Sequence, residues 1–175
     1  LMKGGRVVDR EARGMLLKNK SSIFNPPSRL ALNAKDYQEA NKINKEQGMG
    51  LSKQSWFLFK KILEIDSFLE KKNRPEIFES HPELVFQVMK GGAIETKKNT
   101  QEGLKERIGI LKENGFDKEF IDKFINKKNS FYKNDDFIDS CSLFWSAKRV
   151  VRKNEIQIPN KIIKDKKGII MQMKI

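Results

Sequence analysis

Two aspartates in the last third of the chain have the spacing best suited to chemistry. Asp136 and Asp139 are three residues apart, so on a helix they are neighbours on one face. Two carboxylates on a rigid element can hold Mg²⁺ or Mn²⁺, which prefer carboxylate and water ligands. The same spacing also fits acids in a first helical turn that only complement the helix dipole. Spacing alone leaves both alternatives open.

A second group of reactive side chains lies where a strand is expected to lead into a helix. Glu79 is near the end of segment 75–80, the best internal strand candidate, and the only histidine, His81, comes directly before Pro82. Proline suits the first turn of a helix. His81 could orient or protonate a reacting group, but a single histidine is also typical of a capping or hydrogen-bonding residue.

Four cations are candidate contacts for phosphate groups: Arg29, Lys53, Lys97 and Lys98. Lys53 is expected in the first turn of a helix, where a cation opposes the helix dipole and a nearby anion would compensate. Lys97 and Lys98 lie in the predicted loop 91–100. The alternative for all four is a solvated surface role, which is common for long cations near loops.

Helices are the main elements expected to position these residues. Apolar periodicity, caps and breakers predict helices over residues 8–18, 36–47, 52–71, 83–89, 100–114, 117–126 and 135–152. A terminal hairpin is expected from strands 161–164 and 169–174, turned by 165–168. In helix 135–152, Asp135 is the expected N-cap, and the expected core stripe is Phe137, Cys141, Phe144, Ala147 and Val151.

The composition favours a polyanionic partner. The 175 residues contain 36 Lys and Arg against 23 Asp and Glu, which gives a net charge of +13. Such a balance is typical of proteins that bind nucleic acid or an acidic membrane surface. One cysteine excludes an internal disulfide framework. No apolar run is long enough to span a membrane, so the prediction is a cytoplasmic protein without a membrane partner.

Five stretches in order resemble a known family. They are SSIFNPPSR at 21–29, GLSKQSW at 50–56, ESHPELVF at 79–86, KKNTQEG at 97–103 and DDFIDS at 135–140. Together they are similar to the domain-of-unknown-function 429 family, whose members are described as predicted RNase H-like nucleases. The resemblance covers nearly the whole chain.

The resemblance implies a resolvase-like RNase H fold with a two-metal site. In that superfamily, carboxylates from a mixed sheet and one late helix hold two divalent metals that activate water and stabilise the leaving oxygen of a phosphodiester. By this similarity Glu79, Asp136 and Asp139 are the expected metal ligands, with His81 beside them. The expected cofactor is Mg²⁺ or Mn²⁺.

The chain also departs from the family pattern at its start. The first strand with its aspartate and the strand that ends in an Asp-Ile-Pro-like motif are both missing before Leu1. We therefore expect an N-terminally truncated member, inactive or nearly so alone. The expected fold class is α/β, a single RNase H-like domain over 1–175 that lacks its N-terminal strands and is dominated by helices with a few short strands.

The sequence thus predicts a metal-dependent nuclease that hydrolyses phosphodiester bonds of DNA or RNA. The main alternative is a non-catalytic nucleic-acid-binding module on the same scaffold. A third class is an enzyme that acts on a phosphorylated small molecule, because the superfamily fold also serves kinases and phosphatases.

Overall fold

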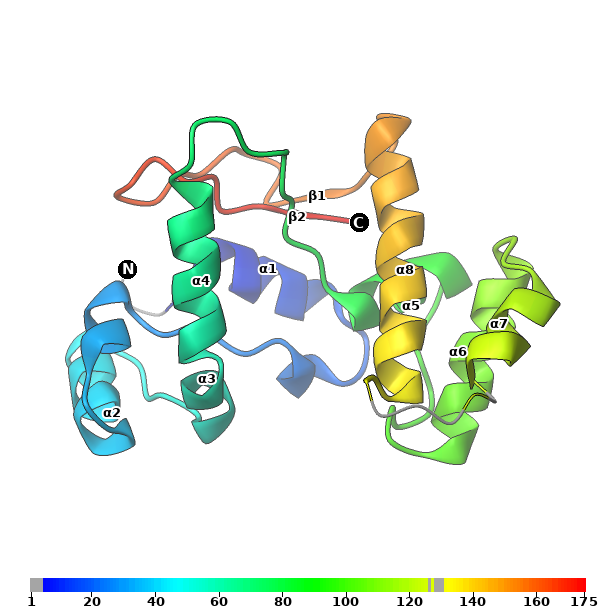
Figure 1. Ribbon diagram of the computed structural model, residues 1–175, viewed down its shortest axis with the longest axis horizontal. Coiled ribbons are helices and arrows are strands. Elements are labelled where there is room, and N and C mark those ends of the chain that lie inside the picture. The colour runs from blue at the N-terminus through cyan, green and yellow to red at the C-terminus, as the bar shows by residue number, and fades with distance from the viewer. Residues whose placement is uncertain (1–4, 126, 128–130) are drawn as a thin grey trace.

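Helices dominate the computed structural model, which describes residues 5–125, 127 and 131–175 (Figure 1). The α-helices are α1 (Val7–Met15), α2 (Tyr37–Glu46), α3 (Lys53–Phe57), α4 (Phe59–Leu69), α5 (Pro82–Lys90), α6 (Gln101–Glu113), α7 (Lys118–Ile125) and α8 (Asn134–Val151). Two 3-10 helices, η1 (Lys20–Ser22) and η2 (Arg29–Asn33), lie between α1 and α2. The predicted dominance of helices is confirmed, and the expected helix end at residue 126 lies outside the described residues.

Among the described residues, the strands are β1 (Gln157–Ile158) and β2 (Met173–Lys174), an antiparallel pair with Ile158 opposite Met173. The predicted strand 75–80 is reduced to one parallel bridge between Glu79 and Met173. The predicted hairpin has its turn at the expected residues. Its two strands, however, pair mainly at positions further from the turn than predicted. Burial explains this register, because Ile158 and Met173 are buried whereas Ile162 is exposed.

The inward face of α8 agrees with the predicted stripe only in part: Cys141 is buried and Phe137 packs against the core. Its buried residues are Ile138, Cys141, Ser142 and Ser146. Phe144 and Val151, expected in the core, are 59% and 83% exposed. The helix also begins earlier, with Lys133 rather than Asp135 as its N-cap. The inward face is therefore rotated relative to the predicted stripe, which changes which carboxylate accompanies Asp139.

The predicted helix 52–71 is two helices that meet at Leu58. Ser52 caps α3 as expected, because its Oγ accepts the N–H of Ser55 at 3.0 Å. Only Phe59 is fully buried in α4, and Leu63 and Ile65 lie at the surface. The apolar periodicity of residues 52–71 therefore predicted helix correctly, but it overestimated how many of these residues lie in the core.

The buried side chains form three hydrophobic clusters. The first joins α1 and the C-terminal residues to α5 through Leu84 and Val85, and the second joins α6, α7 and α8 to α5 through Phe86. The third lies under η2, α2, α3 and α4. In Figure 1, α2, α3 and α4 lie on one side, α6, α7 and α8 on the other, and α1 between them. Helix α5 is therefore the shared support of two clusters.

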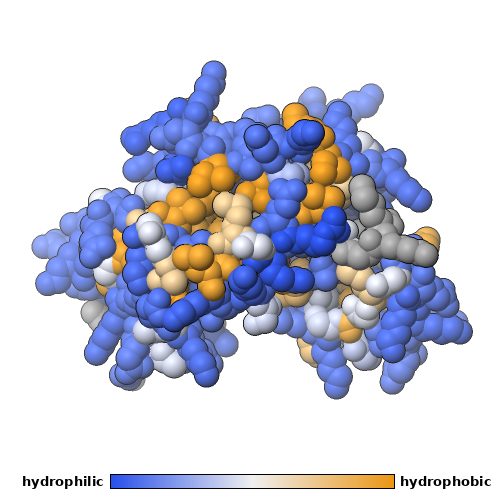
Figure 2. Space-filling model, turned by 180° about the vertical axis from the view of Figure 1, so that it is seen from behind, coloured by the Kyte–Doolittle hydropathy of each residue, from blue (hydrophilic) through white to orange (hydrophobic). Residues whose placement is uncertain are grey.

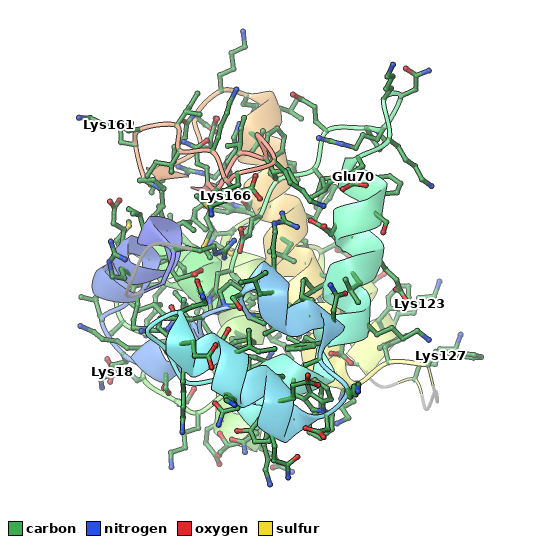
Figure 3. All side chains as sticks on the ribbon, turned by 90° about the vertical axis from the view of Figure 1, so that its left-hand side faces the viewer. Lys18, Glu70, Lys123, Lys127, Lys161 and Lys166 are labelled. Carbon is green, nitrogen blue, oxygen red and sulfur yellow. The ribbon has the colours of Figure 1, made fainter. Side chains whose placement is uncertain are left out.

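The surface is mostly hydrophilic. Figure 2 shows a face covered largely by hydrophilic residues, with an apolar band across its centre. In Figure 3, Lys18 and Lys161 lie toward the left edge of the molecule and Lys123 and Lys127 toward the right edge, so the positive charge is not confined to one face. Across the described ranges, none of the helices is both long enough and apolar enough to cross a membrane.

Candidate functional site

The candidate site is at the N-terminal end of α5, where His81 is the N-cap and Pro82 occupies the first turn. The His81 Nε2 lies 3.3 Å from the carbonyl oxygen of Ser22. A carbonyl oxygen only accepts hydrogen bonds, so this contact places the imidazole proton on Nε2 and leaves the lone pair on Nδ1. Burial lowers the pKa of His81, and the nearby Lys98 charge lowers it further, against the opposing effect of Glu83 and Asp139. The lowered pKa favours the neutral imidazole, whose Nδ1 is buried without a hydrogen-bond partner among the described residues.

Helix α8 brings Asp139 to the same place. Lys98 forms an ion pair with Asp139 Oδ2, and its Nζ lies 4.0 Å from Asp135 Oδ2. Asp135 and Asp139 are four residues apart and share one helix face. Asp136 points elsewhere, because its carboxylate accepts the backbone N–H of Lys133 at 3.0 Å. The structure therefore groups Asp139 with Asp135 and gives Asp136 a capping position.

The environment of Asp139 is unusual for a carboxylate that has an ion-pair partner. Burial raises its pKa, the carboxylates of Glu83 and Asp135 raise it further, and Lys98 only partly offsets them. Its Oδ1 is buried without a hydrogen-bond partner in the described part of the chain. A raised pKa combined with an unsatisfied oxygen is typical of functional sites rather than of carboxylates that only stabilise a fold.

The turn 97–100 positions Lys98. The Thr100 side chain caps α6 by accepting the Gly103 N–H at 3.0 Å, and its hydroxyl donates to the Lys97 carbonyl at 2.9 Å. A Cβ at Gly103 would lie 1.9 Å from that carbonyl oxygen. Glycine is required at Gly103 because the turn passes directly over the helix backbone. This close packing fixes the part of the chain from which Lys98 reaches Asp139.

A buried ion pair supports the site. Arg107 donates to both oxygens of Glu83 at 2.7 and 2.8 Å, and both side chains are almost completely buried. The Arg107 guanidinium also donates to the carbonyl of Gly103 at 2.9 Å. Glu83 is one of the charges that shift the pKa values of His81 and Asp139. The pair thus joins α5 to the start of α6 and holds an anion next to the site.

Glu79 is held by a different contact. Arg6 donates to both of its oxygens at 2.6 and 3.0 Å, and the same guanidinium binds both oxygens of the buried Asp9. Burial would lower the pKa of Arg6, but the hydrogen bonds to Asp9 and Glu79 raise it above its ordinary value. Within the described residues, no three His, Cys, Asp or Glu side chains form a group able to hold a metal. Glu79, Asp136 and Asp139 are therefore not assembled into a three-ligand site here.

The four predicted phosphate contacts have different surroundings. Lys98 lies at the site, whereas Lys97 and Lys53 are exposed. Arg29 is clamped between two carboxylates, Asp66 and Asp165, and burial is a smaller influence on its raised pKa than the hydrogen bond to Asp66. The positive charge of Arg29 is thus already balanced by two carboxylates in this structure.

Two carboxylates are enough for a hydrated divalent cation. Mg²⁺ commonly binds one or two protein carboxylates and completes its coordination with water and substrate phosphate oxygens. Asp135 and Asp139 already share a cation, the Lys98 ammonium, and Asp139 Oδ1 has no partner among the described residues. This donor set fits Mg²⁺ or Mn²⁺ when Lys98 moves aside.

Unsatisfied buried polar atoms occur in three segments of the chain, two of which carry His81 and Asp139. Five buried side-chain atoms have no hydrogen-bond partner in the ranges that the structure describes: Ser22 Oγ, Asn25 Oδ1, Ser80 Oγ, His81 Nδ1 and Asp139 Oδ1. All five belong to segments 21–29, 79–86 or 135–140. Sequence reasoning did not propose Asp135, Ser80 or Asn25 as candidate site residues. For Asp135 the i, i+4 spacing to Asp139 was the available signal, but the face of α8 that turns inward was not known.

Comparison with protein-family models identifies a family that matches most of the chain. The family model described as "Protein of unknown function (DUF429)" matches residues 1–162. No curated protein and no solved structure matches this chain.

Proposed function

The chain belongs to the DUF429 family of proteins of unknown function, and we propose that it acts as a metal-dependent phosphodiesterase on nucleic acid, on an RNase H-like scaffold. The observation that carries the proposal is the grouping of His81, Lys98, Asp135 and Asp139, which come from three separate segments and include unsatisfied buried atoms. Satisfied structural networks do not leave such atoms, because an unpaired buried polar atom costs free energy.

Asp139 and Asp135 would hold Mg²⁺ or Mn²⁺, which would stabilise negative charge on a phosphodiester. Lys98 balances the two carboxylates in the absence of substrate and can turn to a phosphate oxygen, since its side chain is partly exposed. His81 can accept a proton at Nδ1 while Nε2 stays bound to the Ser22 carbonyl. These roles describe hydrolysis of a phosphate ester next to the N-terminal end of α5.

The RNase H-like scaffold is supported by the order of the sequence motifs and by acidic residues in the first turns of the long α8. Glu79, the third expected ligand, lies two residues before His81, and its carboxylate would have to exchange Arg6 for a cation. The nucleic-acid substrate is supported by the net charge of +13.

The test is cleavage of labelled branched, duplex and single-stranded DNA and RNA by the full-length protein in Mg²⁺ or Mn²⁺. Asp139→Asn should abolish cleavage, because it removes a charge from the pair that would bind the cation. Asp136→Asn is the matched control on the same helix turn and should retain activity. Equal activity in the wild type and in Asp139→Asn would contradict this site.

A non-catalytic binding module is the alternative, and the lysines that lie toward opposite edges of the molecule favour it (Figure 3). It predicts salt-sensitive binding of nucleic acid by the wild type, no cleavage with either cation, and no effect of Asp139→Asn on binding.

A further inference from the structure

A hollow of about 360 Å³ lies beside the candidate site, and its walls come from four parts of the chain. Arg13 of α1, Lys20 and Ser21 of η1, Asn25 of the following loop and Ser52 before α3 all line it. This volume is within the range of roughly 300–1,000 Å³ that small-ligand pockets have.

The charges at the hollow are positive and uncompensated. Arg13 and Lys20 both line it, and neither forms an ion pair with a carboxylate within the described ranges. Arg6, Arg29 and Arg107, in contrast, are each paired with one or two carboxylates. No acidic residue is among those described as lining the hollow. Clefts lined by charge of one sign concentrate ions of the opposite sign, so this hollow attracts anions.

The remaining lining groups match the other parts of a nucleotide. Ile23 and Phe24 supply apolar surface, and Ser21 and Ser52 supply hydroxyls. Asn25 also lines the hollow, although its Oδ1 is itself shielded from solvent. A base can pack on the apolar surface, and a sugar can form hydrogen bonds with the serine hydroxyls.

The hollow is joined to the candidate site by consecutive residues. Ser21 lines the hollow, and the next residue, Ser22, contacts His81 through its carbonyl oxygen. Arg13 fixes the same loop from the other side by donating to the carbonyl of Ile23 through Nε at 3.0 Å. A strand whose scissile phosphate lies at Asp139 and His81 therefore has a neighbouring position within reach.

We infer that the hollow between η1 and the start of α3 binds one nucleotide unit of the substrate strand, with its phosphate on Lys20 and Arg13. This inference rests on the proposed action on nucleic acid and deepens it. The hollow supplies strand binding that does not require a metal, so it can be tested apart from cleavage.

The experiment measures the Kd of fluorescein-labelled single-stranded oligonucleotides, DNA and RNA, for the full-length protein in EDTA over a range of salt concentrations. Lys20→Gln should weaken binding and reduce the magnitude of the salt slope by about 0.7, the value for one phosphate contact on a single strand. Lys18→Gln is the matched control, since Lys18 is two residues away, is paired with Glu95 and does not line the hollow. It should leave the slope unchanged.

Identical slopes for Lys20→Gln and Lys18→Gln would overturn the inference, as would wild-type protein that binds no strand. If a nucleoside monophosphate binds in a Lys20-dependent way but strands do not, the site serves a phosphorylated small molecule and the inference is wrong. If Lys20→Gln has no effect but Asp139→Asn abolishes cleavage, the inference about the hollow fails and the proposed function is upheld. Failure of the inference can therefore be distinguished from failure of the proposed function.

Discussion

Arg107 and Glu83 form a buried, bidentate ion pair at 2.7 and 2.8 Å, and the Glu83 charge acts on both His81 and Asp139. Removing one partner leaves the other charge buried and unpaired, which costs about 3–5 kcal/mol. We expect Arg107→Met to lower the free energy of unfolding by about that amount in urea denaturation. Arg152→Met, at the exposed end of α8, should change it by less than about 0.5 kcal/mol.

The double variant Glu83→Leu/Arg107→Met distinguishes the destabilising effect of an unpaired buried carboxylate from that of lost packing around Arg107. Replacing both members of a buried pair by apolar residues is often neutral, so most of the lost stability should return. A double variant as unstable as Arg107→Met would show that packing around Arg107, and not the unpaired carboxylate, is responsible.

Gly103 and Gly109 lie on the same helix and should respond to alanine in opposite directions. A Cβ at Gly103 would lie 1.9 Å from the Lys97 carbonyl oxygen, so Gly103→Ala must displace the turn that carries Lys98. Gly109 has nothing within 4 Å, and Gly109→Ala should stabilise the protein by about 0.5–1 kcal/mol through helix propensity. Thermal unfolding followed by circular dichroism measures both. A Gly103→Ala variant as stable as Gly109→Ala would contradict the packing of this turn.

His81 is the only histidine, so its ring protons report the charge of the site without overlap. Burial lowers its pKa, Lys98 lowers it further, and Asp139 raises it. An NMR titration should therefore give a pKa below 6.5, higher in Lys98→Met and lower in Asp139→Asn than in the wild type. Shifts of the same sign in both variants would show that the two charges do not face the ring.

The lowered pKa of His81 also affects stability. The unfolded state binds the proton more readily, so the stability that His81 contributes is present above pH 6.5 and is lost as the pH falls through the folded-state pKa. The free energy of unfolding of the wild type should therefore fall between pH 7 and pH 5 more than that of His81→Gln. Equal slopes for the two proteins would mean that His81 is not buried as a neutral ring.

Arg29, Asp66 and Asp165 form a surface cluster that also loses stability on acidification, but at a lower pH than His81. The hydrogen bond from Arg29 lowers the pKa of Asp66. Burial raises the pKa of Asp165, but the hydrogen bonds from Arg29 and from the backbone N–H groups of Ile169 and Lys167 together lower it below its ordinary value. Their stabilisation is present above about pH 4, the range of an unfolded aspartate, and is lost as the pH falls through the folded-state values. Arg29→Met should cost about 0–1 kcal/mol at pH 7, because the pair is exposed, and less at pH 3. A cost that grows on acidification would contradict these contacts.

Local signals in the sequence predicted the helices well and the placement of the site only in part. Asp36, Ser52 and Asp117 accept the backbone N–H groups that N-caps are expected to accept. The sequence proposes His81, Lys98 and Asp139 as site residues, and the structure places their charges close enough to act on one another; their functions stay proposals. Periodicity could not show which face of α8 turns inward, because the helix carries apolar residues on several sides and its buried face includes Ser142 and Ser146.

Long-range contacts account for the other differences. Glu79 is held by Arg6, and Arg29 is held by Asp165, which lies 136 positions away in the sequence. No local rule indicates such partners, since charged side chains choose them by the fold and not by spacing along the chain. The short pairing of β1 with β2 likewise depends on the burial of Ile158 and Met173, which only the packed structure fixes.

The third hydrophobic cluster, under η2, α2, α3 and α4, shares no buried residue with the two clusters that meet on α5. Elements that bury their apolar groups separately tend to open as separate cooperative units. Amide hydrogens of α2 and α4 should then exchange through a lower-energy opening than those of α5 and α8. Gly50 and Ser52 belong to this unit, whereas Arg13 and Lys20 do not. Local opening of the unit would therefore widen the hollow without unfolding the rest of the protein.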